Sequence, residues 1–275
     1  MCEVLQVSPS GYHAWLKRPK SSRSTQNEQL VKQIKNIHQQ SRQTYGSPRV
    51  HDELQDRGVT CSENRVARLM RQHGIAAQKK RKFIRTTDSN HSLPIAPNRL
   101  DQCFDVDRPD AVWTADITYI WTGQGWLYLA VVLDLFSRRV VGWSMAPNLE
   151  RTLVIDALKM AITARNPLEG LVHHSDRGSQ YASYDYQKLL QKSKMVTSMS
   201  RRGNCYDNAP TESWFATLKR ELVYRTYYTT HAQARQDIFE YIEVWYNRQR
   251  KHSTIGYMSP VACEQQWKKS TAKAA

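Results

Sequence analysis

Three acidic residues stand in segments that otherwise resemble buried strands or a helix: Asp116, Asp176 and Glu212. Asp116 interrupts the β-branched and aromatic run over residues 112–120, Asp176 ends an apolar run, and Glu212 opens a helical segment. Charged side chains are seldom buried unless they are paired or bind a metal, so these positions indicate a cation. We therefore predict one carboxylate triad, built from two strands and a helix.

A triad made only of carboxylates favours magnesium over zinc, because magnesium prefers oxygen ligands and completes its shell with water and substrate phosphate. Manganese is the expected substitute. Two such ions about 3.5–4 Å apart activate the attacking oxygen and stabilise the leaving oxygen of an in-line phosphoryl displacement. The attacker is water in strand cleavage or a DNA 3′-hydroxyl in strand joining. Lys219 follows Glu212 by two helical turns on the same face, where we expect it to contact DNA phosphate.

Each acid also has an ordinary explanation: Asp116 as a strand-edge charge, Asp176 as a turn residue, and Glu212 as a helix amino-terminal acid. His173 and His174 are adjacent on a strand and point to opposite faces, so we expect packing or hydrogen-bonding roles for them. Asp134 is expected to form a turn. Asp207 and Asn208 precede Glu212 and are expected to order its loop, with Asn208 or Thr211 capping the helix.

The elements that would carry the acids follow one another from about residue 108. The pattern predicts a hairpin of two strands, a third strand, and then alternating helix and strand; the segments are 112–120, 126–134, 140–145, 151–165, 170–176, 183–193 and 195–199. This order indicates an α/β fold with a mixed five-stranded sheet of the ribonuclease H-like type, with flanking helices. Neighbouring strands lie about 4.8 Å apart, so Asp116 and Asp176 could share a metal if their strands pair.

The amino-terminal part resembles a small all-α unit. Helices are expected from about residue 26 to 40 behind a Thr25–Glu28 capping box, from 47 to Gly58, and from Ser62 to Gly74. Three short helices with a basic last one resemble a helix-turn-helix, whose final helix enters the major groove. A helical hairpin with a solvated basic face is the alternative. The expected DNA contacts are Arg65, Arg68, Arg71, Lys79, Lys80, Arg81 and Lys82.

Composition agrees with a folded, nucleic-acid-binding protein. The 275 residues carry a formal net charge of +15, which favours a polyanionic partner. Five scattered cysteines without a Cys-x-x-Cys pair favour reduced thiols over a disulfide framework or zinc site. No apolar run is long enough to span a membrane and the first twenty residues lack a signal-peptide centre, so we expect a cytosolic protein.

Several motifs together resemble the Asp-Asp-Glu transposases of the insertion sequence three family over nearly the whole chain. They are Trp113-Thr-Ala-Asp-Ile-Thr-Tyr, Leu133-Asp-Leu-Phe-Ser-Arg, His174-Ser-Asp-Arg-Gly-Ser-Gln-Tyr and Gly203-Asn-Cys-Tyr-Asp-Asn-Ala-Pro-Thr-Glu-Ser with Lys219, then Tyr45-Gly-Ser-Pro-Arg-Val, Arg68-Leu-Met, Tyr246-Asn-Arg-Gln-Arg-Lys-His and Ser259-Pro260.

The resemblance implies a fold similar to that of retroviral integrases. It also implies that Asp116, Asp176 and Glu212 are the metal-binding catalytic residues and that Lys219 accompanies them. The implied activity is cleavage at the terminal inverted repeats of a mobile element and 3′-hydroxyl attack on target DNA. The implied partners are double-stranded DNA, further copies of the chain on that DNA, and a first-reading-frame product supplied by frameshift fusion. The implied setting is the bacterial cytoplasm near the nucleoid. The sequence has no heptad run of the kind that the first frame supplies.

On this basis the chain divides into an amino-terminal segment (1–24), a helix-turn-helix-like domain (25–82), a linker (83–107), an integrase-type core with carboxy-terminal helices (108–262) and a basic tail (263–275). Two other functions fit the same fold: a DNA-binding regulator without catalysis, and a ribonuclease H-like nuclease that only hydrolyses. Fold alone does not separate them, because function depends on the site.

Overall fold

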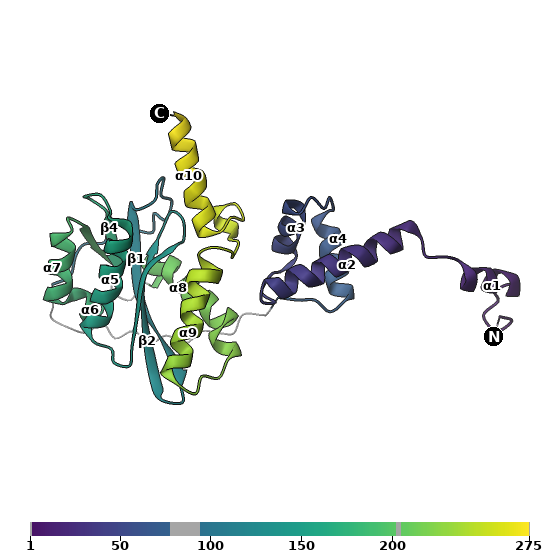
Figure 1. The fold of residues 1–275 in the computed structure, drawn as a ribbon, viewed down its shortest axis with the longest axis horizontal. Helices are drawn as coiled ribbons and strands as arrows, with labels where there is room; N and C mark the ends of the chain where they lie inside the picture. Colours follow the sequence, from purple (N-terminus) through teal and green to yellow (C-terminus); the bar gives the residue numbers. More distant parts are fainter. Residues whose placement is uncertain (1, 78–93, 202–204, 275) are drawn as a thin grey trace. The chain divides into compact units, whose positions relative to one another are not determined.

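A computed structural model describes residues 2–77, 94–201 and 205–274 of the chain, and it divides into two compact units, residues 1–78 and 79–275 (Figure 1). Each unit is described by itself. Four of the basic residues predicted to contact DNA, Lys79, Lys80, Arg81 and Lys82, lie outside the described residues.

The first unit is helical, with α1 (Pro9–Lys17), α2 (Ser22–Gln40), α3 (Ser47–Asp56) and α4 (Glu63–Gln72). The predicted start of α2 behind a capping box was wrong: the helix begins at Ser22, because the Ser21 side chain accepts a hydrogen bond from the Ser24 N–H. The start of α4 is confirmed, since the Ser62 side chain accepts from the Arg65 N–H.

Apolar residues at helical spacing hold α2, α3 and α4 together. The buried residues are Leu30, Val31, Ile34, Ile37, Val50, Leu54, Val66, Leu69 and Met70. The positions predicted to face inward on α3 and α4 are therefore buried, and this unit is a small helix-turn-helix-like domain.

The second unit is built on a sheet of five strands, which confirms the predicted mixed sheet. The strands are β1 (Val112–Thr122), β2 (Gly125–Asp134), β3 (Val140–Ala146), β4 (Val172–Ser175) and β5 (Val196–Met199). Their order is β3-β2-β1-β4-β5. The first three strands pair antiparallel, whereas β4 pairs parallel with both β1 and β5.

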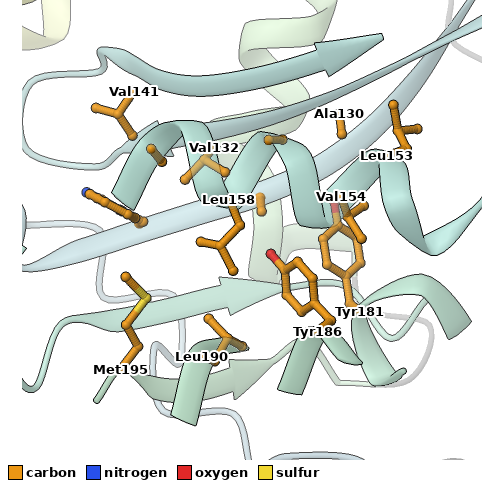
Figure 2. Packing of buried hydrophobic residues seen from close by; sticks show 14 of the residues in the cluster. Ala130, Val132, Val141, Leu153, Val154, Leu158, Tyr181, Tyr186, Leu190 and Met195 are labelled. Atoms are coloured by element: carbon orange, nitrogen blue, oxygen red, sulfur yellow. The ribbon is translucent and has the colours of Figure 1, made fainter. Parts of the chain in front are cut away.

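One face of the sheet is covered by α5 (Arg151–Arg165), α6 (Ser179–Ala182) and α7 (Tyr184–Lys192), and the buried core lies between these helices and the strands (Figures 1 and 2). Gly142 on β3 allows α5 to approach closely, because a side chain there would lie 2.2 Å from the Ala157 carbonyl oxygen. The other face is covered by α8 (Ala209–Glu221) and α9 (His231–Glu240) (Figure 1).

After α9 the chain continues through a π-helical turn (Tyr241–Tyr246) into α10 (Pro260–Ala274). Glu264 of α10 is buried and pairs with Arg139 at 2.7 Å and with Arg165 at 2.8 Å. The first residues of the range expected as a basic tail are therefore packed against the core. Within the described residues, none of the helices has both the length and the apolar character needed to cross a membrane.

Candidate active site

Asp116 and Asp176 lie beside each other where the pairing of two parallel strands ends: Asp116 is within β1, and Asp176 directly follows β4. The pairing of β1 with β4 runs to Ala115 opposite Ser175, and each aspartate is the next residue along its chain segment. Parallel neighbours lie about 4.8 Å apart, so the sheet alone brings these two carboxylates together. Ligands of open α/β sheets bind at this end of the strands.

Backbone N–H groups orient both carboxylates. The Asp116 carboxylate accepts a hydrogen bond from the Ile117 N–H at 2.7 Å, and the Asp176 carboxylate accepts from the Gly178 N–H at 2.9 Å. Gly178 leaves room for this turn, because a side chain there would lie 3.0 Å from the same Asp176 oxygen. The turn leads directly into α6, so Asp176 is fixed between a strand end and a helix start.

Glu212 lies in the first turn of α8, and polar contacts attach that turn to β1. The Thr211 hydroxyl is 2.7 Å from the Thr114 hydroxyl, and the Asn208 side-chain amide donates to the Ala115 carbonyl at 3.2 Å. Asn208 occupies the capping position without a side-chain capping bond, which differs from the prediction, because its amide is used to contact the strand. These contacts place the first turn of α8, which carries Glu212, beside the β1 residues that precede Asp116.

Asp207 fixes the chain just before α8. Its buried carboxylate accepts from the Arg201 N–H at 2.7 Å, from the Arg201 guanidinium at 2.9 Å and from the Gln102 amide at 3.2 Å. The hydrogen bonds from Arg201 lower the pKa of Asp207 to about 2, against a smaller opposing effect of burial. This residue therefore orders the approach to Glu212, as the sequence predicted. Gln102 was not predicted as its partner, since 105 positions separate the two residues.

The electrostatics show that the three acids influence one another. Burial raises the pKa of Asp116 well above its ordinary value, and the negative charges of Asp176 and Glu212 raise it further. The Ile117 N–H and the Lys219 ammonium oppose this rise. The site thus holds like charges with one nearby cation, and an added cation would relieve that repulsion.

Lys219 lies on α8 between the acids and an aromatic ring. Its Nζ lies 4.9 Å from the centroid of the Tyr119 ring, and burial lowers its pKa while the charge of Asp116 acts in the opposite direction. The helical spacing predicted that Lys219 returns to the face of Glu212. Its ammonium also interacts electrostatically with Asp116.

The two histidines before Asp176 do not join the acids. His173 Nε2 lies 3.0 Å from the Tyr186 hydroxyl, and His174 lies between the hydroxyls of Ser198 and Ser200, at 2.8 and 3.1 Å. Burial lowers the pKa of His173 to about 3 and that of His174 to about 4, so both are neutral at pH 7. The predicted packing and hydrogen-bonding roles are confirmed.

Tyr181 of α6 is a neighbour of the acids that sequence reasoning missed. Its hydroxyl is buried and has no hydrogen-bond partner within the described residues. Burial raises its pKa well above the ordinary value, and Tyr186, Asp116 and Asp176 raise it further. An aromatic residue in a short helix normally indicates core packing, so no signal in the sequence distinguished it.

The donor set fits a hard divalent cation, because it consists of carboxylate oxygens whose mutual repulsion a cation would relieve. Within the part of the chain that the structure describes, no three or more His, Cys, Asp or Glu side chains are already arranged around a metal position. The three acids interact electrostatically, although the described residues do not arrange them as one ligand group.

The basic residues predicted on α4 differ in their surroundings. Arg65 is half-buried, and its guanidinium donates to the Asn27 side-chain oxygen of α2 at 2.9 and 2.7 Å. Arg68 and Arg71 are exposed. Arg65 therefore ties α4 to α2. Contact of these arginines with DNA stays a prediction.

Comparisons with known protein families agree with this architecture. Residues 106–205 and residues 193–260 match two family models that are each described as an integrase core domain, and residues 25–83 match an HTH-like domain. Together these matches cover both units of the chain.

Two curated relatives are similar over almost their full length. The insertion element IS600 uncharacterized 31 kDa protein of Shigella sonnei is 44% identical over 272 residues, which covers 99% of this chain and 100% of the relative. The transposase InsF for insertion sequence IS3A of Escherichia coli is 41% identical over 262 residues, which covers 94% of this chain and 91% of the relative. Among solved structures, a chain of a simian T-cell lymphotropic virus intasome matches with 15% identity and a TM-score of 0.49, covering 84% of this chain and 74% of that one.

Proposed function

The chain belongs to the transposase family of insertion sequence IS3, and on that premise we propose that Asp116, Asp176 and Glu212 are the metal-binding catalytic residues of DNA strand cleavage and joining. The observation that supports the proposal is the pairing register of β1 and β4, which brings Asp116 of β1 beside Asp176 at the end of β4. The rise in the pKa of Asp116 caused by Asp176 and Glu212 supports the third member.

In this proposal the three carboxylates bind magnesium, with manganese as a substitute and two ions as the expected number. The cations supply the activation of the attacking oxygen and the stabilisation of the leaving oxygen. The chain itself holds the carboxylates in place through the Ile117 and Gly178 N–H groups. Lys219 provides a positive charge for a DNA phosphate near the scissile bond.

The partners follow from the same family membership. The first unit, with Arg68 and Arg71 exposed on α4, is proposed to bind the element ends, and the second unit to bind the cleaved strand and its target. We propose that several copies assemble on the DNA, and that a first-reading-frame product acts as fusion or partner. The cytoplasm of a bacterium is the proposed setting.

The test is cleavage and joining of labelled DNA in manganese by purified full-length chain, compared with Asp116→Asn, Asp176→Asn and Glu212→Gln. Removing a group that orients or stabilises the reacting atoms typically costs about 100-fold or more in rate. We therefore expect each variant to lose at least that much of both activities. Asp156→Asn is the matched control, because Asp156 is an exposed aspartate on α5, a helix that carries none of the three acids.

The products separate the alternatives. Joined products that require all three acids support transposition chemistry. Products that persist in the triad variants would contradict the proposed site. If nicked DNA accumulates and joined DNA never forms, the chain is a hydrolytic nuclease. If the chain binds DNA but neither cleaves nor joins it, even when it is fused to the first-frame product, it is a DNA-binding regulator.

A further inference from the structure

The hairpin that follows Asp116 presents two tryptophans to solvent. Trp121 on β1 is 56% exposed and Trp126 on β2 is 44% exposed. They pair across the hairpin in register, and their ring centroids are 4.8 Å apart in an edge-to-face arrangement. Two large aromatic rings gathered on one exposed site are a feature of binding surfaces rather than of ordinary protein surface.

The tip of this hairpin is fixed by the segment between α8 and α9. Thr122 forms a β-bridge with Tyr228, the Gly123 N–H donates to the Tyr228 carbonyl at 2.8 Å, and the His231 N–H donates to the Gln124 side chain at 2.8 Å. The tryptophans are therefore carried by an anchored strand pair. A rigid aromatic surface binds at a smaller entropic cost than a loose one.

A continuous set of contacts joins this surface to the acids. The Tyr119 ring lies 5.0 Å from the Trp126 ring in an edge-to-face contact. The Lys219 ammonium lies 4.9 Å from the Tyr119 centroid and interacts electrostatically with Asp116. Because Tyr119 and Trp121 lie three and five residues after Asp116, their rings project from the opposite face of β1, and the Lys219 ammonium links that face to the acids.

We propose that Trp121 and Trp126 form a stacking site for unpaired bases of the DNA strand whose phosphate is bound at the acids. Every base has a π-face, so exposed rings bind single-stranded DNA without base-specific hydrogen bonds, and a neighbouring cation holds the backbone. A DNA strand that passes from the acids around β1 would meet the Lys219 ammonium first, with its phosphate, and the tryptophans next, with its bases. This inference rests on the proposed function, since it extends the same site.

The surface favours nucleic acid over a protein partner for two reasons. The Tyr119 ring beside Trp126 contacts the Lys219 ammonium, whereas protein interfaces are depleted of charge at their core. The net charge of +15 also favours a polyanion over a second copy of an equally basic chain. A second copy is nevertheless an outcome that the experiment distinguishes.

The experiment measures binding of the full-length chain to two DNA probes in EDTA, where no strand chemistry occurs. One probe is a blunt duplex, and the other carries a short single-stranded 3′ tail with the fluorescent base 2-aminopurine. The variants are Trp121→Thr, Trp126→Thr and the double substitution, because threonine preserves the strand preference while removing the ring. Trp126→Phe restores a ring. Phe239→Ala is the matched control, since Phe239 is also 50% exposed and makes an edge-to-face contact, with Trp143.

Stacking on a protein ring contributes about 1–3 kcal/mol per base, so each Trp→Thr variant should bind the tailed probe at least about fivefold more weakly. Binding of the blunt duplex should be unchanged, the quenching of 2-aminopurine should fall, and Trp126→Phe should recover much of both. Equal losses for the two probes, or no loss at all, would overturn the inference. A lower molar mass of the tryptophan variants in sedimentation, without a change in probe preference, would also overturn the inference. It would identify the tryptophans as part of an interface between copies of the chain.

Binding in EDTA does not depend on the carboxylate chemistry. If the tryptophan variants behave like the wild type while the triad variants lose strand joining, the stacking site is refuted and the proposed function stands. If the tailed probe is preferred through the tryptophans but triad variants keep their activity, the proposed catalytic residues are refuted and the binding site stands.

Discussion

The two glutamates of α8 have opposite surroundings. Glu221, at the end of the helix, is buried and accepts from the Arg250 guanidinium at 2.7 Å and from the Tyr241 hydroxyl at 2.9 Å. Burial raises its pKa, but the charge of Arg250 and the hydrogen bonds more than offset this, so the pKa of Glu221 lies below its ordinary value. Glu212, in the first turn, is one of the negative charges that raise the pKa of Asp116.

The difference separates acids that stabilise the fold from acids suited to binding a cation. The same contrast holds elsewhere in the second unit, where buried Glu264 pairs with two arginines. At Asp116 burial raises the pKa most, Asp176 and Glu212 raise it further, and Lys219 makes the smaller of the two opposing contributions. A buried acid with its own arginine needs no ligand, whereas acids that repel one another are stabilised by a metal ion.

Removing the compensating cation at the Glu221 end should give the largest change in stability. Arg250→Met leaves Glu221 buried without its arginine, and breaking such a pair costs about 3–5 kcal/mol. Thermal or urea unfolding of the full-length chain measures this loss. Arg248→Met is the control, because Arg248 is exposed and two positions away, and its replacement should change the free energy of unfolding by less than about 0.5 kcal/mol.

A second substitution checks that the charge is the cause. Combining Arg250→Met with Glu221→Gln removes the uncompensated carboxylate, so the double variant should be more stable than Arg250→Met alone. A double variant less stable than either single variant would show that packing of the Arg250 side chain, rather than the buried charge, dominates at this end of α8.

For the cluster of Asp116, Asp176 and Glu212, the expected change in stability has the opposite sign. Asp116→Asn removes a carboxylate whose pKa is raised by burial and by like charges, so the variant should melt higher than the wild type at pH 7. About 1 kcal/mol corresponds to about 2–4 °C in Tm for a unit of this size. The Ile117 N–H keeps its acceptor, because asparagine retains a side-chain carbonyl oxygen.

The pH dependence follows from the direction of that shift. When the folded state has the higher pKa it binds more protons than the unfolded chain, so the carboxylate destabilises the fold increasingly as pH rises through the interval between the two values. The advantage of Asp116→Asn should therefore be largest at neutral pH and vanish towards pH 4, near the ordinary pKa of about 3.9. A constant advantage of Asp116→Asn across pH would contradict the electrostatic origin.

The sequence predicted the elements whose causes are local. The start of α4 follows from Ser62, its buried face from Val66, Leu69 and Met70, and the strand of Asp116 from its β-branched run. The sequence predicted the meeting of Asp116 and Asp176 only on the condition that their strands pair, and the parallel pairing of β1 with β4 meets that condition.

Partners distant in sequence could not be predicted. The contacts of Gln102 with Asp207 and of Arg139 with Glu264 join residues 105 and 125 positions apart, and neither pair has a local signal. Tyr119 was predicted as an ordinary strand residue, and only the fold brings Lys219 over its ring. Such contacts depend on how α8 and α10 pack on the sheet, which hydrophobic periodicity does not specify.

The smallest expected effect is the response of the free protein to a divalent cation, and it sharpens the contrast between the two ends of α8. A ligand that binds only the folded state stabilises it by RT ln(1 + [L]/Kd), about 1.4 kcal/mol at ten times Kd. Magnesium or manganese should therefore raise the Tm of the wild type by a few degrees, against a sodium chloride control of equal ionic strength. Asp116→Asn should lose this shift, whereas Asp156→Asn and Arg250→Met should keep it, because neither changes the acids that would bind the ion.

Equal shifts in Asp116→Asn and wild type would place the cation elsewhere. A wild type without any shift would count against a metal site that is preformed in the absence of DNA.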